Sequence, residues 1–161
     1  MKQLLVPTLL ILAATLNAQS FKHFKTSYSS ERYVLEYIFE EYDFGKNKGY
    51  EFYPSKPIDI VIEVNTLAKR YLSSTLEKLK EKNGEIYMKC FFKTNGEMIS
   101  FNFQIKKKII QCILEDELLE FINAFNNQLN ILDYVHFENQ KSPGYSIYNF
   151  PIPQRNRQNT K

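Results

Sequence analysis

Residues 84–106, GEIYMKCFFKTNGEMISFNFQIK, decide the fold, because apolar and polar residues alternate on both sides of Asn95-Gly96. Asn-Gly favours a two-residue hairpin turn, since both turn positions need a positive φ. A hairpin centred there pairs Cys90 with Phe101 and Phe92 with Ile99. One face is then entirely apolar, and its members are Ile86, Met88, Cys90, Phe92, Ile99, Phe101, Phe103 and Ile105. A slip of one residue would break this match, so the pattern predicts a hairpin of defined register.

The segments around the hairpin predict helices and short strands. Apolar residues spaced three and four apart indicate helices over residues 31–43, 66–82 and 116–129. Alternation indicates a strand over residues 58–64, and short apolar runs indicate strands over 134–137 and 145–150. Residues 109–114 fit either an extension of the hairpin or the start of the next helix. The expected fold is α+β: an antiparallel or mixed sheet, with helices on one face and the hairpin 86–106 at its centre.

The first 18 residues have the layout of a secretory signal peptide. Lys2 precedes an apolar core over residues 4–16, and Ala18 offers a small residue at a cleavage site before Gln19. The apolar core is too short for a comfortable membrane span. We therefore expect cleavage after Ala18, export to the periplasm or medium, and no membrane span afterwards. Residues 19–153 would form a single α+β domain, and residues 154–161 a flexible basic tail.

Composition excludes several classes of function. The chain has 21 Lys and Arg; removal of Lys2 with the leader leaves 20 against 18 Asp and Glu, a net charge of +2. Such a balance does not favour nucleic acid as a partner. We find no phosphate-binding loop, dinucleotide fingerprint or paired-His motif, so we expect no cofactor and no metal site. The acidic residues at 115–117 and 120 match the positive end of a helix dipole.

Two cysteines and one histidine leave alternatives open. Cys90 and Cys112 could pair in an oxidising compartment, or stay as two buried thiols. His136, with Asp133 and Glu138 close by in the sequence, could act as a general base. No serine or cysteine lies in a recognisable nucleophile turn beside it, so we expect His136 not to be catalytic. We expect residues 19–29 to form an exposed lead-in, with His23 inert.

Residues 84–153 resemble the C-terminal domain of TonB-type energy transducers. The resemblance lies in the run GEIYMKCFFKTNGEMISFNFQI, the helix predicted after it, and the final YSIYNFPIP. It implies a strand, turn, strand, helix, strand order and binding of a peptide from strand to strand. It does not imply energy transduction, because that activity needs an uncleaved anchor and a proline-rich spacer.

The last predicted strand is the candidate binding segment. It follows Ser142-Pro143-Gly144, comes last in the chain and is expected to stop at Pro151. An edge strand there would offer unpaired backbone groups to an extended partner. The candidate residues are Tyr145, Ile147, Tyr148 and Asn149; the alternative is that this strand merely covers the sheet. The sequence thus favours a non-catalytic binding or structural module of the bacterial cell envelope, whose partner is another envelope protein or peptide. The other hypothesis is an envelope hydrolase or inhibitor-like domain with His136 in its site.

Overall fold

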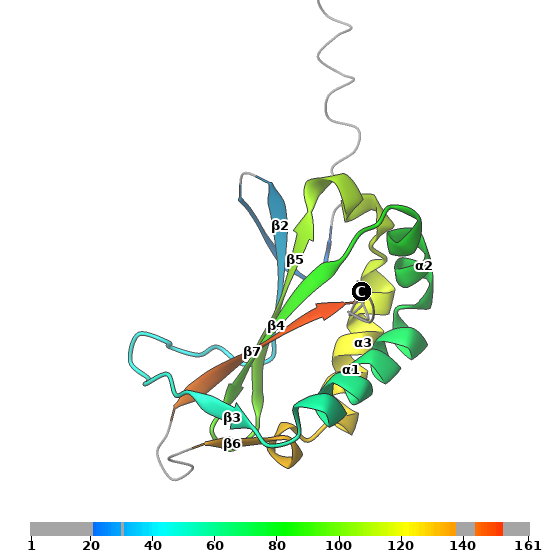
Figure 1. Cartoon of the computed structure of the whole chain (residues 1–161). Coiled ribbons are helices and arrows are strands. Elements are labelled where there is room, and N and C mark those ends of the chain that lie inside the picture. The colour runs from blue at the N-terminus through cyan, green and yellow to red at the C-terminus, as the bar shows by residue number, and fades with distance from the viewer. Residues whose placement is uncertain (1–20, 30, 138–143, 153–161) are drawn as a thin grey trace, which may run out of the picture.

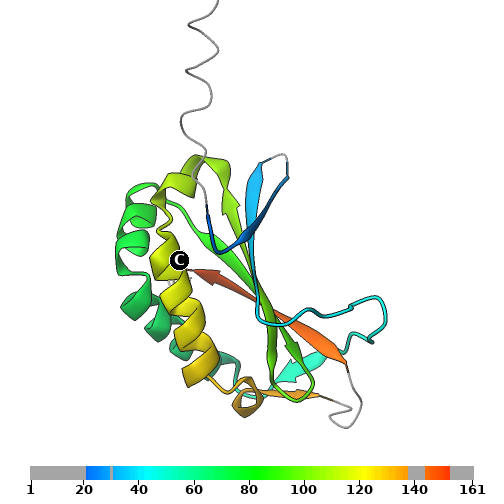
Figure 2. The same ribbon diagram turned by 180° about the vertical axis from the view of Figure 1, so that it is seen from behind.

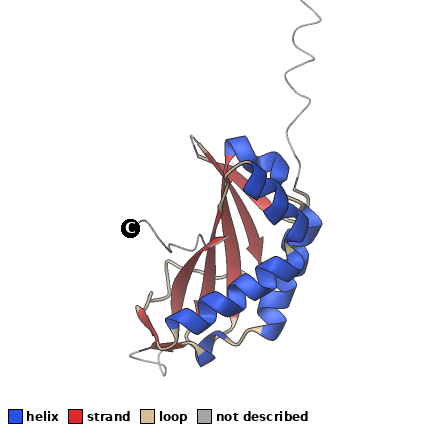
Figure 3. Ribbon diagram, turned by 45° about the vertical axis from the view of Figure 1, so that its right-hand side comes forward, coloured by secondary structure: helices blue, strands red, loops and turns tan. Residues whose placement is uncertain are grey.

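A five-stranded antiparallel sheet in the order β1-β2-β5-β4-β7 forms one layer of the molecule, and helices cover one of its faces (Figures 1 and 3). The structure is a computed structural model that describes residues 21–29, 31–137 and 144–152. The predicted signal peptide and tail therefore lie outside the described residues. The α+β prediction, with helices on one face of an antiparallel sheet, is confirmed.

The strands of the large sheet are β1 (Lys25–Tyr28), β2 (Arg32–Ile38), β4 (Ile86–Lys93), β5 (Met98–Lys106) and β7 (Tyr145–Ile152). The helices are α1 (Pro57–Tyr71), α2 (Ser73–Glu81) and α3 (Glu115–Gln128). A small second sheet pairs β3 (Phe52–Pro54) with β6 (Val135–Phe137). Short 3-10 turns are η1 (Lys107–Cys112) and η2 (Ile131–Asp133). The ambiguous residues 109–114 thus begin in η1 rather than in a longer strand or in α3.

The register of the central hairpin is confirmed through most of its length. Cys90 faces Phe101 and Met88 faces Phe103, as the alternation predicts. These side chains are fully buried against the helix layer. The ring of Phe125 on α3 meets that of Phe101 edge-on, with centroids 5.0 Å apart. The apolar face of the hairpin therefore packs against the helices and forms the sheet side of the hydrophobic core.

The prediction is wrong next to the turn. Phe92 faces Met98 rather than Ile99, because the register shifts after residue 91. The loop contains residues 94–96, one more than expected, and Gly96 has a φ of 90°. A three-residue loop that ends on a left-handed glycine is a common alternative to the two-residue turn.

The predicted strand 58–64 is wrong, because these residues form the first half of α1. Ile60 and Val64 are buried and lie four residues apart on one side of the helix. Ile58 and Ile62 are 72% and 55% exposed on the other side. Isoleucines at positions 58, 60 and 62 produce the alternation that is typical of a strand. In the helix, however, only Ile60 of these three lies on the buried face. Pro57 suits the first turn of a helix, where its missing N–H costs nothing. The helix predicted over 66–82 is in fact two, α1 and α2, which meet at residue 72.

The helix predicted over residues 31–43 is also wrong. Residues 32–38 form β2, whose Leu35 is buried opposite Phe103 of β5. Tyr33, Leu35 and Tyr37 alternate toward the core, and this alternation coincides with apolar residues at helical spacing. Pairing with β5, about 70 residues away, decides between the two patterns, and this pairing cannot be seen from the residues of the segment alone.

Residues 21–28 belong to the fold rather than to an exposed lead-in. Phe21 and Phe24 are each only 6% exposed, and β1 follows them. Figure 2 shows β1 beside β2 at the far edge of the sheet. The backbone N–H of His23 donates to Glu115 Oε1 at 2.7 Å, so this carboxylate helps to hold the turn between the buried Phe21 and Phe24. Burial raises the pKa of Glu115, but the hydrogen bonds from His23 and Lys22 outweigh burial and lower it overall.

Cys90 and Cys112 are free and buried in the structure, not joined in a disulfide. Cys90 lies on β4 in the core, and burial raises the pKa of its thiol to about 12. Cys112 lies at the end of η1, where its Sγ is 3.8 Å from the Lys78 carbonyl. The arrangement is that of two packing residues rather than of a reactive pair.

The acidic residues at the start of α3 act on other elements as well as on their own helix. Glu117 accepts hydrogen bonds from the N–H groups of Ser74 at 3.0 Å and Thr75 at 2.8 Å. These groups lie in the first turn of α2, which has no side-chain cap of its own. A carboxylate from a neighbouring helix thus supplies the cap.

We predict that Glu117→Gln lowers the free energy of unfolding by about 1–2 kcal/mol at neutral pH. Burial raises the pKa of Glu117, but the bonds from Thr75 and Ser74 lower it overall. Its stabilisation is therefore present above the unfolded-state pKa and is lost as pH falls through the lower folded-state pKa. Urea titrations across acid pH should show a shallower loss of stability in the variant. Asp116→Asn, at an exposed position of the same turn, is the matched control. An equal effect of both substitutions would contradict the cap.

Candidate functional site

The outer edge of β7 is the candidate site. β7 is the last strand of the sheet and pairs with β4 on one side (Figure 1). Within the described residues, only its start has a neighbour on the other side, where Gly49 forms a parallel bridge with Tyr145. The rest of that edge, from Ile147 onward, has no strand beside it among the residues that the structure describes.

Hydrogen bonds at the start of β7 show which backbone groups face outward. The Gly144 carbonyl accepts from the Thr94 N–H at 3.1 Å, toward β4. The next residue points the other way: the Tyr145 N–H donates to the Lys48 carbonyl at 3.1 Å, and its carbonyl accepts from the Tyr50 N–H at 2.8 Å. Because N–H and C=O directions alternate along a strand, those of residues 147 and 149 also point away from β4.

Pro151 fits the same alternation. The sequence predicts that the strand ends before this residue, but β7 continues to Ile152. Pro151 lies opposite Tyr87 of β4. Like residues 147 and 149, it occupies a position of outward parity, one whose backbone groups point away from β4. Its missing N–H would point to the open edge, so it removes no hydrogen bond with β4. Proline occurs within sheets at such edge positions.

A groove of about 420 Å³ lies where the chain before β3 leaves the start of β7. Its lining residues are Gly49, Tyr50, Glu51, Tyr145, Ser146 and Ile147. One wall is held to the other, because the Ser146 hydroxyl donates to the Tyr50 carbonyl at 2.7 Å. The groove therefore opens beside Ile147, the first edge position without a neighbour among the described residues.

An aromatic cluster supports this wall from the solvent face of the sheet. The Phe44 ring lies 4.8 Å from that of Tyr145 and 5.4 Å from that of Phe91, centroid to centroid. Tyr42 contacts both Phe44 and Tyr145. The loop between β2 and β3, cyan in Figure 1, is thereby fixed over the end of the sheet.

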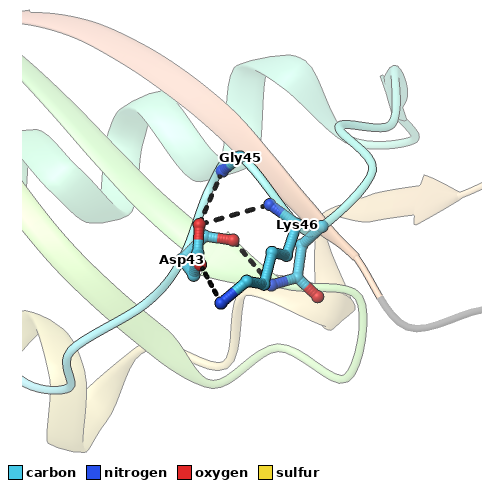
Figure 4. A network of polar contacts seen from close by, with 4 residues as sticks. Asp43, Gly45 and Lys46 are labelled. Carbon is cyan, nitrogen blue, oxygen red and sulfur yellow. Dashed lines mark hydrogen bonds and ion pairs between the residues drawn. The ribbon is translucent and has the colours of Figure 1, made fainter.

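Polar contacts close the same loop. Asp43 Oδ1 accepts from the N–H groups of Gly45 at 3.0 Å and Lys46 at 3.2 Å, and Oδ2 lies 3.0 Å from Lys46 Nζ (Figure 4). The bond with the Lys46 side chain, with help from the two backbone bonds, keeps the pKa of Asp43 below its usual value. At the base of the loop, Lys93 Nζ lies 2.6 Å from Glu40. These contacts fix the turn that precedes the groove-lining segment 49–51.

The structure separates the four predicted binding residues into two groups. The backbone N–H and C=O groups of Tyr145, Ile147 and Asn149 point away from β4, and the side chains of Ile147 and Asn149 are exposed. Tyr148 has the opposite parity and stacks on Phe150 at 4.2 Å, on the helix side of the sheet. Sequence reasoning missed the segment 48–51 altogether. Its pairing with Tyr145 spans almost a hundred residues, and no local pattern signals it.

His136 is exposed on β6, opposite Tyr53. Glu138 lies outside the described residues. A hollow of about 450 Å³ nearby is lined by Lys56, Asp59, Ile62, Glu63, Asp133 and Tyr134, and His136 is not among its lining residues. Burial and these carboxylates raise the pKa of Tyr134. This hollow therefore gathers three carboxylates without His136.

Two further properties concern the described residues only. They contain no group of three or more His, Cys, Asp or Glu side chains that could hold a metal ion. None of their helices combines the length and the apolar character that crossing a bilayer requires.

The chain was compared with protein-family models, curated proteins and solved structures. None of the three comparisons finds a match.

Proposed function

We propose that this protein is an exported, non-catalytic binding module that captures an extended segment of another envelope protein by adding it as a strand to the outer edge of β7. The observation that carries the proposal is the outward direction of the backbone groups of Ile147 and Asn149 at an edge with no described neighbour. Such groups accept a further extended chain with the hydrogen bonds of an ordinary sheet.

The edge is short and its limits are defined. The segment 48–50 occupies the side of β7 at Tyr145, and Pro151 offers a carbonyl but no N–H. An added strand therefore pairs over residues 147–151, with two donors and three acceptors from β7. Each net hydrogen bond contributes about 0.5–1.5 kcal/mol, so backbone pairing by itself supports weak, reversible capture.

We predict that Ile147→Pro weakens peptide capture at least about tenfold, because it removes an outward donor without removing a bond to β4. The probe is a mixture of capped peptides of about eight residues that alternate β-branched and polar side chains. Binding is followed by NMR shifts of the backbone amides of β7, and Ile147→Val, which keeps the N–H, is the matched control. Wild-type binding by the proline variant, or no shift at Asn149 with any peptide, would exclude strand addition.

Export is tested separately. The apolar core over residues 4–16 supports removal of a leader after Ala18. N-terminal sequencing of the protein from medium or periplasm should begin at Gln19. Recovery of a membrane-bound product that still begins at Met1 would rule out this part of the proposal.

A further inference from the structure

We propose that the groove beside Ile147 takes one large apolar side chain, aromatic or branched, from an extended segment of a different protein, and that a second copy of this chain is not the occupant. The inference rests on the proposed strand addition and names the residue class that it selects. It follows from the position of the groove and from the registers that the edge permits.

The groove lies where an added strand would place a side chain. A residue that pairs with Ile147 has its side chain on the same face of the sheet as the Ile147 side chain, because opposite residues in a ladder share a face. Ile147 and Tyr145 both line the groove, and Ile147 is 37% exposed there. Tyr50 supplies the facing wall. The neighbouring side chain of the added strand would point to the opposite face, so a single side chain enters the groove.

The walls of the groove exist before any ligand binds. Tyr145 is held by Tyr42 and Phe44 at 6.0 and 4.8 Å between ring centroids. Tyr50 is held through its backbone by Tyr145 and Ser146. A fixed recess lined in part by Tyr50, Tyr145 and Ile147, next to backbone groups with no partner among the described residues, gains binding free energy from an apolar side chain without first having to order its walls. A small or polar side chain would leave the recess filled with water.

The registers of the edge argue against a second copy. Two β7 strands related by a two-fold axis would pair antiparallel. The axis passes the same residue in both strands, and a residue a given number of positions before it lies opposite the residue the same number of positions after it. An axis at Ile147 or Tyr148 brings residues 149–151 of the second copy beside Tyr145. Its N–H and C=O are already bonded to Lys48 and Tyr50, so the incoming strand meets the segment 48–50.

An axis farther along β7 fails for another reason. With the axis at Asn149, Pro151 of the second copy lies opposite Ile147 and provides no N–H for the Ile147 carbonyl. With the axis at Phe150, Pro151 lies opposite Asn149 with the same defect. No two-fold register therefore bonds all five outward groups of residues 147–151, whereas a chain with an N–H at every position bonds all five and leaves only its own carbonyl opposite Pro151 without a donor.

The test uses capped peptides of about eight residues, alternating valine and threonine, that differ only at one central position: Phe, Leu, Ala or Ser. The full mature protein is titrated with each peptide, and the shifts of the Ile147 and Asn149 amides report strand addition. We expect the Phe and Leu peptides to bind at least about tenfold more tightly than the Ala and Ser peptides. Equal affinities together with amide shifts would overturn the groove inference and leave strand addition standing. Absence of amide shifts with every peptide would overturn strand addition itself.

Two variants separate the groove from the edge. Tyr145→Ala removes one aromatic side chain from the β7 wall, and Ile147→Thr makes another part of that wall polar at an exposed position while keeping its N–H. In both, the preference for Phe over Ala should fall to about twofold or less. An undiminished preference in Ile147→Thr would place the side chain elsewhere.

Sedimentation of the full mature protein tests the choice of occupant. We expect a monomer at concentrations that saturate peptide binding. A dimer that Ile147→Pro dissociates would make a second copy the occupant and overturn the inference.

Discussion

Replacing Phe101 by alanine should lower the free energy of unfolding by about 3–5 kcal/mol. The side chain is fully buried at the centre of the sheet. Its ring centroid lies 5.0 Å from that of Phe125, 5.9 Å from that of Phe39 and 6.3 Å from that of Phe103. These rings come from α3, the chain after β2 and β5 itself, so no one element can move to fill the cavity. Loss of transfer free energy and a residual cavity therefore add.

Urea unfolding followed by circular dichroism measures this effect. Tyr87→Ala is the matched control, because Tyr87 lies on the same hairpin but on the opposite face and is 37% exposed. The control should lose less than half as much stability. Similar losses for the two variants would mean that the helix-covered face is not the main core.

The hairpin could be predicted from the sequence because its signals are local and agree with one another. The pairing of Cys90 with Phe101 follows from alternation alone, and the chemistry of Asn95-Gly96 places the turn within one residue of its position. The helix and strand assignments over residues 31–43 and 58–64 failed for the opposite reason. In each, the apolar residues satisfied two periodicities, and a distant partner decides which face is buried: β5 for the first segment, and the core beneath α1 for the second.

The candidate site likewise has one part that could be predicted from the sequence, the edge strand, and one that could not, the groove. The position of β7 in the chain and the proline at 151 pointed to a terminal strand, and β7 does end the sheet. The groove could not be predicted, because it depends on a contact between the segment 48–51 and Tyr145, almost a hundred residues apart in the sequence. Tyr148 belongs to the predicted binding residues because it lies within the predicted edge strand. Strand parity turns it toward the helices instead.

We expect Gly144→Ala to detach the segment 48–50 from β7 and to lower the free energy of unfolding by about 2–3 kcal/mol. A Cβ at residue 144 would overlap the Tyr50 ring and the Lys48 carbonyl. A backbone carbonyl in a paired segment cannot turn aside as the end of a flexible side chain can. The segment must move, and it then loses its hydrogen bonds with Tyr145 and Ser146.

Amide hydrogen exchange reports this detachment directly. Protection of the Tyr50 and Tyr145 amides should fall in Gly144→Ala, while the amides of β4 that pair with β5 keep theirs. Gly45→Ala, in the loop between β2 and β3, is the matched control, because a Cβ there meets only the Asp43 carboxylate oxygen, at 3.3 Å. Unchanged protection of Tyr50 in Gly144→Ala would show that the wall accommodates the extra carbon.

Detachment also has a consequence for self-association. Once Tyr145 loses its partners, the open edge grows toward the start of β7, and the two-fold register centred on Ile147 is no longer obstructed. Gly144→Ala should therefore dimerise at concentrations at which the wild type is monomeric, and Ile147→Pro in the same chain should reverse this, because that register uses the Ile147 N–H. A monomeric Gly144→Ala protein with an exposed Tyr145 amide would mean that Pro151, rather than the segment 48–50, is what protects this edge from its own copies.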